Sequence, residues 1–222
     1  MDRIPEPEEL MADAAQALAY DQGNFTASHS RRVELFRERY PQQEIAGTVL
    51  DLGTGSGDML ERFAAAHPRA NFVAVDGAAA MLDLARRRVG ANPSLQGRVS
   101  FITAFLPADA IPPADYSVVM SHSMLHHLFE PQVLWQTVRQ HAGRNSFVFV
   151  ADLRRPASER AAAQTIEQLA ADEPQVLRRD FYNSLCAAFT ADEVRAQLVR
   201  AGLGLKVEEV DDIHLLAYGF LR

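Results

Sequence analysis

Short apolar runs alternate with amphipathic stretches through the middle of this 222-residue chain. The runs TVLDL, NFVAVD, RVSFI, YSVVMS and SFVFVAD have the length and the β-branched or aromatic content of buried strands. Helices are expected between them over 57–66, 78–89 and 131–142, and a proline-rich loop joins the third run to the fourth. This alternation predicts parallel strands joined by right-handed helical crossovers, with helices on both faces of one sheet.

The last two apolar stretches, 204–210 and 213–221, lie too close together for a crossover and predict an antiparallel hairpin. Before them, Thr190 and Glu193 form a capping box that opens a helix, and Gly202 ends this helix. The expected fold class is therefore α/β: a doubly wound, mostly parallel seven-stranded sheet with a final antiparallel hairpin.

Two helical regions fall outside this repeat. The first is N-terminal, where apolar residues recur at helical spacing over 8–20 and over 29–40, the second stretch ending at Pro41. These helices predict an N-terminal helical lid, residues 1–44, ahead of the main domain, residues 45–222.

The second region is a helical insertion that follows the fifth strand over 157–189, with Pro174 between its two pieces. Its apolar residues are expected either to pack the insertion onto the sheet or to form the contact of a homodimer. They are Leu169, Val176, Leu177, Leu185 and Phe189.

Composition narrows the range of partners and compartments. The 22 Lys and Arg residues against 29 Asp and Glu residues give a net charge of -7, which opposes nucleic-acid binding. The single Cys186 cannot form an internal disulfide, and the acidic start MDRIPEPEEL lacks the apolar centre of a signal peptide. No apolar run approaches the ~20 residues of a membrane span, and no Cys/His spacing indicates a metal site. We expect a cytoplasmic, metal-independent protein.

Three glycines follow the first strand in VLDLGTGSGD, at positions 53, 55 and 57. Such a cluster marks a backbone that adopts positive φ or lets a ligand approach closely. Parallel sheets bind ligands at the carboxyl ends of their strands, and this loop lies at such an end. Asp76 ends the next strand, where an acidic side chain can accept hydrogen bonds from both hydroxyls of a ribose. The two features predict a nucleotide-type cofactor.

The spacing of the glycines distinguishes between two such cofactors. A dinucleotide site has G-x-G-x-x-G, whereas this loop has G-x-G-x-G with Asp51 before it and Asp58 after it. Two carboxylates would repel a pyrophosphate, but they suit a ligand that carries an ammonium and a sulfonium. This argument favours S-adenosylmethionine.

Together these motifs resemble the class I, Rossmann-like, S-adenosylmethionine-dependent methyltransferases. The resemblance lies in VLDLGTGSGD, VAVDGAAAML, DYSVVMSHSMLHHL and the closing hairpin, and it covers roughly 45–153 and 190–222. It implies that the glycine loop passes beneath the methionine part of the cofactor, that the acid ending the second strand holds the ribose, and that the residue five places later packs against the adenine. The cofactor residues implied in this way are Asp51, Gly53, Thr54, Gly55, Gly57, Asp76, Gly77 and Met81.

The chain departs from this family after the third strand, where an Asp near the adenine amino group is common. ITAFLPAD has Ala104 and Phe105 at that place. Phe105 either covers the adenine, with backbone groups contacting the edge of the base, or is an ordinary core aromatic. Ser121, just past the fourth strand, is expected beside the sulfonium.

His122 and His126 follow the fourth strand in SHSMLHHL and are candidate general bases, because imidazole titrates near neutral pH. The alternative is that LHH shapes a turn, as it usually does in the family, and this is what we expect of His127. No base is required if the acceptor is already ionised, since positioning supplies much of the rate of methyl transfer.

Segments 20–32 and 178–183 carry aromatic and arginine side chains that a minimal fold does not need, and we expect them to cover the cofactor. Arginine binds carboxylates in a bidentate manner, but solvated surface arginines are the alternative, and this is what we expect of Arg86, Arg87 and Arg88. The candidate substrate-binding residues are His29, Arg154, Arg179 and Tyr182.

The first functional hypothesis is therefore methyl transfer from S-adenosylmethionine to a small-molecule acceptor. Three alternatives stay open. The chain could be a non-catalytic or regulatory S-adenosylmethionine-binding protein, or a related enzyme with non-methylating chemistry such as carboxy transfer. A dinucleotide-dependent oxidoreductase comes last.

Overall fold

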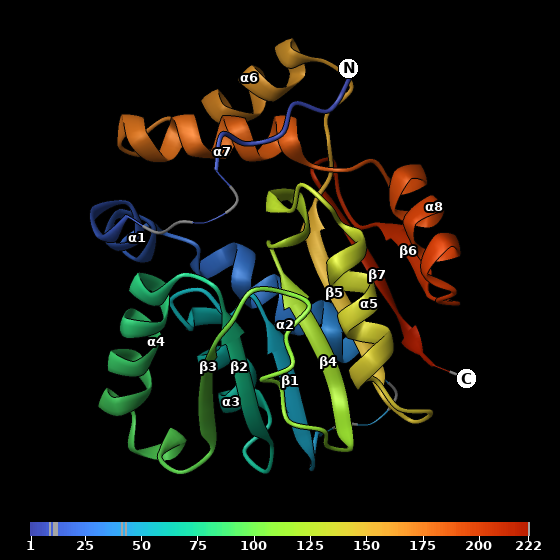
Figure 1. Cartoon of the computed structure of the whole chain (residues 1–222). Helices are drawn as coiled ribbons and strands as arrows, with labels where there is room; N and C mark the ends of the chain where they lie inside the picture. The colour runs from blue at the N-terminus through green and yellow to red at the C-terminus, as the bar shows by residue number, and fades with distance from the viewer. Residues whose placement is uncertain (9, 11–12, 41, 43, 222) are drawn as a thin grey trace.

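The apolar runs form the strands of one sheet and are buried on both faces, as expected for parallel strands between two helix layers. The strand order is β3-β2-β1-β4-β5-β7-β6 (Figure 1). Strands β1 to β5 pair in parallel, β7 pairs antiparallel with β5, and β6 pairs antiparallel with β7. The predicted fold class is confirmed. The strands are β1 (Thr48–Leu52), β2 (Asn71–Asp76), β3 (Val99–Thr103), β4 (Tyr116–His122), β5 (Phe147–Leu153), β6 (Lys206–Glu209) and β7 (His214–Phe220).

Helices cover both faces of the sheet (Figure 1). On one face, Phe36 and Phe63 from the helices pack edge to face against each other and close to Phe149 of β5. On the other face, the indole of Trp135 is fully buried. The first face carries α2 (Thr26–Arg39), α3 (Asp58–Ala66) and α4 (Ala79–Ala91), and the second carries α5 (Gln132–His141) and α8 (Ala191–Ala201). The predicted capping box at the start of α8 is present, and Gly202 ends the helix in the left-handed conformation.

This computed structural model describes residues 1–8, 10, 13–40, 42 and 44–221. In the described part, α1 (Ala14–Asp21) begins where the side chain of Asp13 accepts a hydrogen bond from the Gln16 amide at 2.8 Å. Helix α2 begins at Thr26, three residues before the start expected from the sequence. Three residues of the first expected N-terminal helix, Glu9, Met11 and Ala12, lie outside the described residues, as does Pro41, which was expected to end the second.

The insertion forms α6 (Glu159–Leu169) and α7 (Gln175–Ala187), which are separated at Pro174 as the sequence predicts. Leu185 and Phe189 are buried and serve for packing, whereas Val176 and Leu177 are half-buried and Leu169 is 62% exposed. The N-terminal segment lies along this unit, and the Ile4 amide donates to the Cys186 carbonyl at 3.1 Å. Two short 3-10 helices complete the fold, η1 (Pro93–Leu95) and η2 (Leu125–His127).

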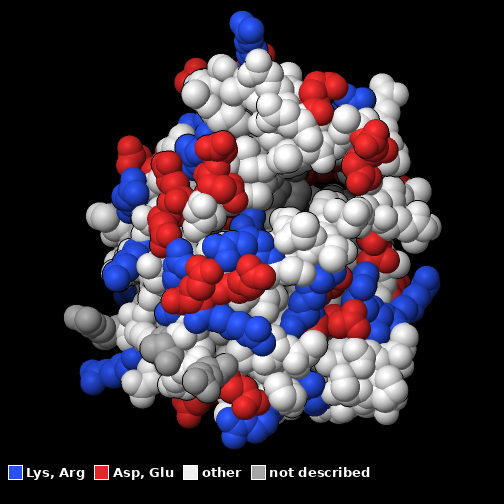
Figure 2. All heavy atoms as spheres, turned by 180° about the vertical axis from the view of Figure 1, so that it is seen from behind, with Lys and Arg blue, Asp and Glu red and all other residues white. Residues whose placement is uncertain are grey.

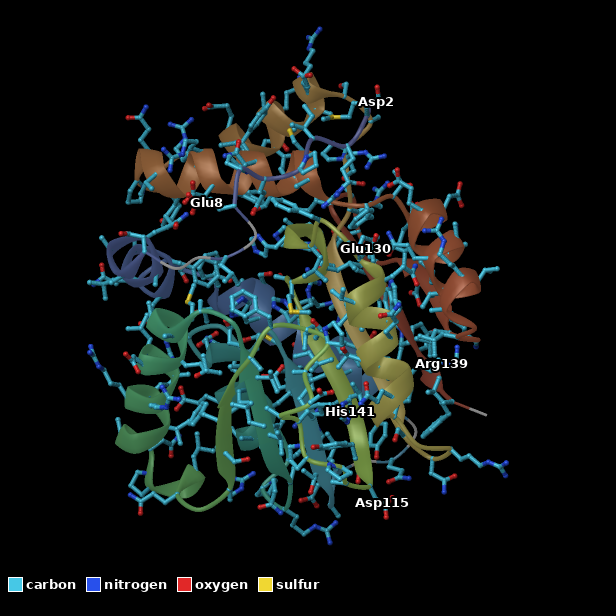
Figure 3. The ribbon with its side chains drawn as sticks, in the orientation of Figure 1. Asp2, Glu8, Asp115, Glu130, Arg139 and His141 are labelled. Carbon is cyan, nitrogen blue, oxygen red and sulfur yellow. The ribbon has the colours of Figure 1, made fainter. Side chains whose placement is uncertain are left out.

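The N-terminal segment and the insertion lie at the carboxyl ends of the parallel strands. Figure 3 shows Asp115 at the beginning of β4, and Glu130 and Glu8 toward the other end of the sheet, beneath α7. The covered end is therefore the one where α/β sheets bind ligands. Among the residues that the structure describes, no helix is long and apolar enough to cross a membrane.

The contact between α5 and α8 gives a stability prediction. The buried Trp135 indole donates to the Gln197 side-chain oxygen at 2.8 Å. Gln197→Met should lower the free energy of unfolding by about 1–3 kcal/mol, because the indole N–H would lose its acceptor while remaining buried. The matched control is Val199→Met on the exposed side of the same helix, where the native side chain is 80% exposed. Urea denaturation should show a change within about 0.5 kcal/mol for this control, and equal effects of the two substitutions would contradict the prediction.

Candidate functional site

The glycine loop after β1 adopts the backbone conformation that its composition predicts. Gly53, Gly55 and Gly57 have φ angles of +75°, +56° and +81°. The amides of Gly53 and Thr54 donate to the Val75 carbonyl at 2.8 and 3.0 Å, which ties the loop to the end of β2. A Cβ on Gly53 would lie 2.4 Å from the sulfur of Met124, whereas a Cβ on Gly55 would meet nothing within 4 Å. The loop is thus packed on one side and open on the other.

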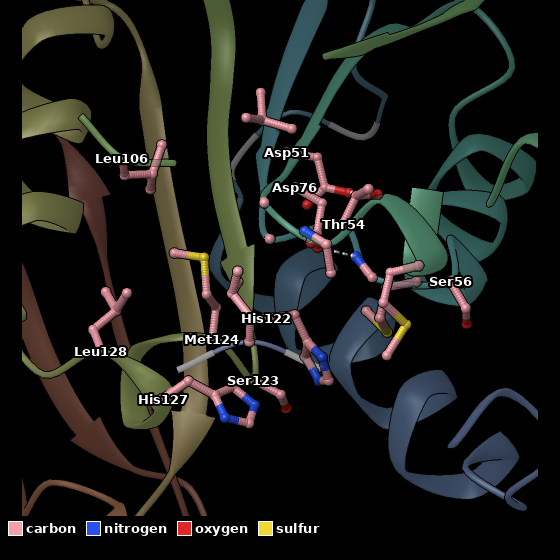
Figure 4. A pocket seen from close by; sticks show the side chains of 18 of the residues that line it. Asp51, Thr54, Ser56, Asp76, Leu106, His122, Ser123, Met124, His127 and Leu128 are labelled. Carbon is pink, nitrogen blue, oxygen red and sulfur yellow. Dashed lines mark hydrogen bonds between the residues drawn. The ribbon is translucent and has the colours of Figure 1, made fainter. Parts of the chain in front are cut away.

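The open side faces a cavity of about 420 Å³ at the carboxyl ends of β1, β2 and β4, where the strand order reverses (Figure 4). This volume is in the range of small-ligand sites. The cavity brings together most of the residues that the sequence assigned to the cofactor, and also one candidate base and one candidate substrate residue. They are Asp51, Gly53, Thr54, Gly55, Gly57, Asp76, Gly77, Met81, Ala104 and Phe105, together with His122 and His29.

The side chain of Asp76, the predicted ribose-binding acid, is held by two backbone amides. One carboxylate oxygen accepts from the Gly55 amide and the other from the Ala78 amide, both at 2.8 Å. Burial raises the pKa of this carboxyl. Each oxygen keeps a second acceptor site, so the carboxylate can take two further hydroxyl donors.

Asp51 is almost fully buried and accepts a hydrogen bond from the Thr54 hydroxyl at 2.7 Å. Burial, together with the charge of Asp76 close by, raises the pKa of Asp51 to about 7. A cationic ligand group would stabilise the Asp51 carboxylate, whereas a pyrophosphate would be repelled by it. The residues present therefore fit S-adenosylmethionine and oppose a dinucleotide.

The rim of the cavity carries an aromatic side chain. Phe105 is 67% exposed, so it is not an ordinary core aromatic. A Cβ on Gly77 would lie 3.1 Å from Leu10 and 3.5 Å from Phe105, which shows how closely these side chains approach the loop after β2. Phe105 is thus placed where it can cover a ligand.

Histidines and other aromatic rings line the end of the cavity near β4. The ring of His122 meets that of His29 edge-on at 5.0 Å, and His29 stacks on Phe25, which contacts Tyr20 at 4.8 Å. His29 is oriented by a hydrogen bond between its Nδ1 and Asp58. Burial, aided by the nearby charges of His29 and Arg32, holds the pKa of His122 well below its usual value. His122 is therefore a neutral imidazole at the cavity wall.

His126 does not line the cavity, in contrast to the expectation of a general base. Its Nδ1 is 2.6 Å from one carboxylate oxygen of Asp152, and the other oxygen accepts from the Leu125 amide at 2.8 Å. Burial opposes protonation of His126, but the Asp152 carboxylate outweighs it and raises the pKa of the ring. The turn of η2 directs His126 into the interior and His127 toward the cavity, where His127 is hydrogen-bonded to Glu6. Only this turn decides which of two adjacent histidines reaches the site.

Four other predicted residues lie away from the cofactor cavity, and each for a local reason. Ser121 is buried within β4 and points to the face opposite His122, because side chains alternate along a strand. Arg154 donates to the Asp212 carbonyl at 2.6 Å, in the turn before β7. Tyr182 packs into the apolar cluster of the insertion, and Arg179 is paired with Asp180 at 3.0 Å.

A second cavity, of about 720 Å³, lies between the N-terminal segment, α1 and α7. It shares Leu10 and His127 with the cofactor cavity, and Arg179 is among its lining residues. The side chains of Glu6, His126 and His127 offer atoms within 4.8 Å of one another, although no metal site was expected. The two histidine rings are instead engaged with the carboxylates of Glu6 and Asp152.

Arg88 has a structural role that the sequence did not reveal. It was expected to be solvated, but it donates to Asp21 of α1 at 2.5 Å and to the Ser56 carbonyl of the glycine loop at 3.1 Å. It therefore fastens the lid to the loop. A run of three arginines gives no signal of which one faces inward.

Comparisons with known proteins agree with this geometry. Residues 49–145 match the family model described as a methyltransferase domain. No curated protein sequence matches the chain significantly. A SAM-dependent methyltransferase from Aquifex aeolicus has a similar structure, with a TM-score of 0.69 and 17% identity over 95% of this chain and 99% of that chain.

Two further similar structures contain the cofactor or its demethylated product. The plantazolicin methyltransferase BpumL, in complex with a triazolic desmethylPZN analog and SAH, has a TM-score of 0.67 and 15% identity over 94% of this chain and 90% of that chain. The DhpI-SAM-HEP complex has a TM-score of 0.62 and 22% identity over 92% of each chain. Residues 49–145 therefore carry a methyltransferase domain, and nearly the whole chain has the fold of S-adenosylmethionine-dependent methyltransferases, which supports S-adenosylmethionine-dependent methyl transfer as its activity.

Proposed function

We propose that the acceptor of the methyl group is a small molecule that binds beneath a cap formed by the N-terminal lid, residues 1–44, and the insertion, residues 157–189. The observation that carries the proposal is that the second cavity adjoins the cofactor cavity under these two segments. A cavity of this size beneath two such segments suits a compact ligand better than a polymer. Residues 45–222, which include the insertion, then form the S-adenosylmethionine-binding methyltransferase domain.

The surface supports the same proposal. The face seen in Figure 2 carries basic and acidic side chains intermixed, without a continuous basic patch. The net charge of -7 likewise disfavours a nucleic-acid acceptor. Besides the cofactor, two of the similar structures hold a desmethylPZN analog and HEP. The single buried Cys186 is consistent with the cytoplasmic location that we propose.

The residues of the chain have separable roles in this reaction. Bound S-adenosylmethionine supplies a methyl group on a positively charged sulfur. Asp51 would hold the cationic methionine end and Asp76 the ribose hydroxyls. His122, neutral at the cavity wall, can accept a proton from the acceptor, while the cap excludes water. Positioning of the acceptor would supply much of the rate.

The acceptor class can be tested with S-adenosylmethionine that carries a radiolabelled methyl group. We expect label to enter the low-molecular-mass fraction of a cell extract and not its protein or nucleic-acid fractions. The Asp76→Ala variant serves as the inactive control. Label recovered in a macromolecule would contradict the proposal and leave the methyltransferase activity itself intact.

Asp76→Ala should weaken the binding of S-adenosylhomocysteine by about 1.5–3 kcal/mol, because hydrogen bonds from ligand hydroxyls to a charged group would be lost. Titration calorimetry measures the affinity, and circular dichroism checks that the fold is retained. The matched control is Asp83→Ala on the exposed side of α4, whose carboxylate pairs with Arg86. An unchanged affinity in Asp76→Ala would remove Asp76 from the ribose site.

The raised pKa of Asp51 predicts a pH dependence of cofactor binding. In the free protein the Asp51 carboxyl gains a proton as the pH falls below about 7, and the ammonium of S-adenosylhomocysteine would favour its ionised form. Binding should then release a proton, so affinity should fall as the pH is lowered from 7 to 5.5, by up to about ten-fold per pH unit. Calorimetry in buffers of different ionisation enthalpy detects the proton. Asp51→Asn should bind with no such pH dependence, and a pH-independent wild type would refute the assignment.

A further inference from the structure

Arg32 is a buried guanidinium without a counterion. It lies on α2, one turn after His29, and is 2% exposed. Within the part of the chain that the structure describes, its side chain makes no hydrogen bond and no ion pair. Arg155, in contrast, is a buried arginine whose guanidinium has both a hydrogen-bond acceptor and a counterion. It is 8% exposed, donates to the Ala188 carbonyl at 3.0 Å and pairs with Glu193 at 2.6 Å.

Arg32 is not itself among the residues that line the cofactor cavity, but two residues close to it are. His29, one turn earlier on α2, and His122, at the end of β4, both line that cavity. The charge of Arg32 is close enough to His122 and to His214 of β7 to lower the pKa of both rings. Sheet register places Ala151 beside His122, and Leu216 beside Ala151, so His214 lies on the same face as His122. Arg32 therefore lies beside the row of strand ends that continues outward from the cavity.

The carboxylates nearest to Arg32 already have other partners. Asp211 accepts from Nδ1 of His214 at 2.8 Å and from the Ile213 amide at 3.0 Å. Asp152, on the opposite face of β5, is bound to His126 and to the Leu125 amide. The remaining charged or titratable groups around Arg32 are His29, which is hydrogen-bonded to Asp58, His122, and the exposed Arg31 of its own helix. Neither carboxylate is within ion-pair distance of the guanidinium.

An uncompensated buried charge is costly to the free protein. Burial lowers the pKa of Arg32, but a guanidinium stays protonated at neutral pH, so the charge persists. The nitrogens are not completely enclosed. The enclosed side-chain nitrogens without a partner belong to His67, His141 and Arg154, and those of Arg32 are not among them. A buried charge that is retained at such a cost, one helical turn from a residue that lines a ligand cavity, indicates a ligand of opposite sign.

We propose that Arg32 binds an anionic group, a carboxylate or a phosphoryl group, of the methyl acceptor. This inference rests on the proposed function and names the class of its acceptor. The planar guanidinium can bind either group through two parallel hydrogen bonds. His122, whose ring makes no hydrogen bond among the described residues, lies close enough to contact the same acceptor and to take up a proton from it.

The acidic second cavity would suggest the opposite, a cationic acceptor, but its carboxylates are largely satisfied. Glu6 accepts from Ser184 at 2.6 Å, and Asp13 caps α1. Asp180 accepts from Gln16 at 3.1 Å and pairs with Arg179. These groups do not carry the unpaired charge that distinguishes Arg32.

The test measures anion binding without any turnover. The samples are the wild type, Arg32→Met, Arg32→Lys and the control Arg31→Met, each saturated with S-adenosylhomocysteine. Each is titrated with sodium acetate or sodium methylphosphonate at constant ionic strength, and its melting temperature is measured. Arg31 is the matched control because it is exposed and pairs with Glu34 and Glu38. We expect at least one probe to raise the melting temperature of the wild type more than sodium chloride does. A larger rise with acetate indicates a carboxylate on the acceptor, and a larger rise with methylphosphonate indicates a phosphoryl group.

Arg32→Met should bind the effective probe about 10- to 100-fold more weakly, Arg32→Lys should retain part of the response, and Arg31→Met should match the wild type. In the absence of probe, Arg32→Met should melt at or above the wild-type temperature, because the unpaired charge is gone. Arg155→Met should melt well below it.

Three results would overturn the proposal: a wild type that responds to neither probe, an Arg32→Met variant that responds equally, or one destabilised as strongly as Arg155→Met. Calorimetry with S-adenosylhomocysteine on the same samples separates this failure from failure of the cofactor site. Arg32 is not expected to affect cofactor affinity, so loss of that affinity in the wild type would count against the proposed function instead.

Discussion

The hydrogen bonds between the glycine loop and the end of β2 are the constraint on which the site depends. Parallel register pairs Leu52 with Val75, so the loop leaves β1 beside the point where Asp76 ends β2. Val75 then accepts two loop amides through its carbonyl, and Asp76 accepts the third through its side chain. The loop that faces the ligand and the acid that would hold its ribose are thereby fixed as one unit. A shift of register by one residue would separate them.

Several ionisable groups at this end of the sheet are buried where their charged forms are energetically unfavourable. Asp51 and Asp76 are carboxyls with raised pKa values, and Arg32 is a cation with no ion-pair partner among the described residues. Burial is the common cause, because low polarity penalises charge of either sign. The two signs come from different elements, with the acids at the ends of β1 and β2 and the guanidinium on α2. Such a separation suits two ligands of opposite charge in adjacent sites.

The cap depends on contacts between the two ends of the sequence. Arg3 donates to the Ala187 carbonyl at 2.6 Å and to the His126 carbonyl at 2.9 Å, which joins the N-terminal segment to the insertion and to the turn after β4. Glu6 extends the same connection to Ser184 and His127. A movement of the lid would therefore reach His127 at the cavity wall directly. This coupling gives the cap a physical means of responding to whatever occupies the cavity.

The sequence by itself determined the fold and the cofactor loop. The signals used were local: apolar periodicity, the capping box at Thr190 and the glycines after β1. Each can be recognised in the sequence because it depends on neighbours a few residues away. Three features were decided only by the tertiary structure. They are which of His126 and His127 faces the cavity, which arginine of 86–88 turns inward, and that Arg32 is buried with no counterion among the described residues. In each case the outcome depends on groups more than twenty residues distant, such as Asp152 for His126 and Asp21 for Arg88. Burial and charge pairing are properties of the packed molecule, so no local pattern encodes them.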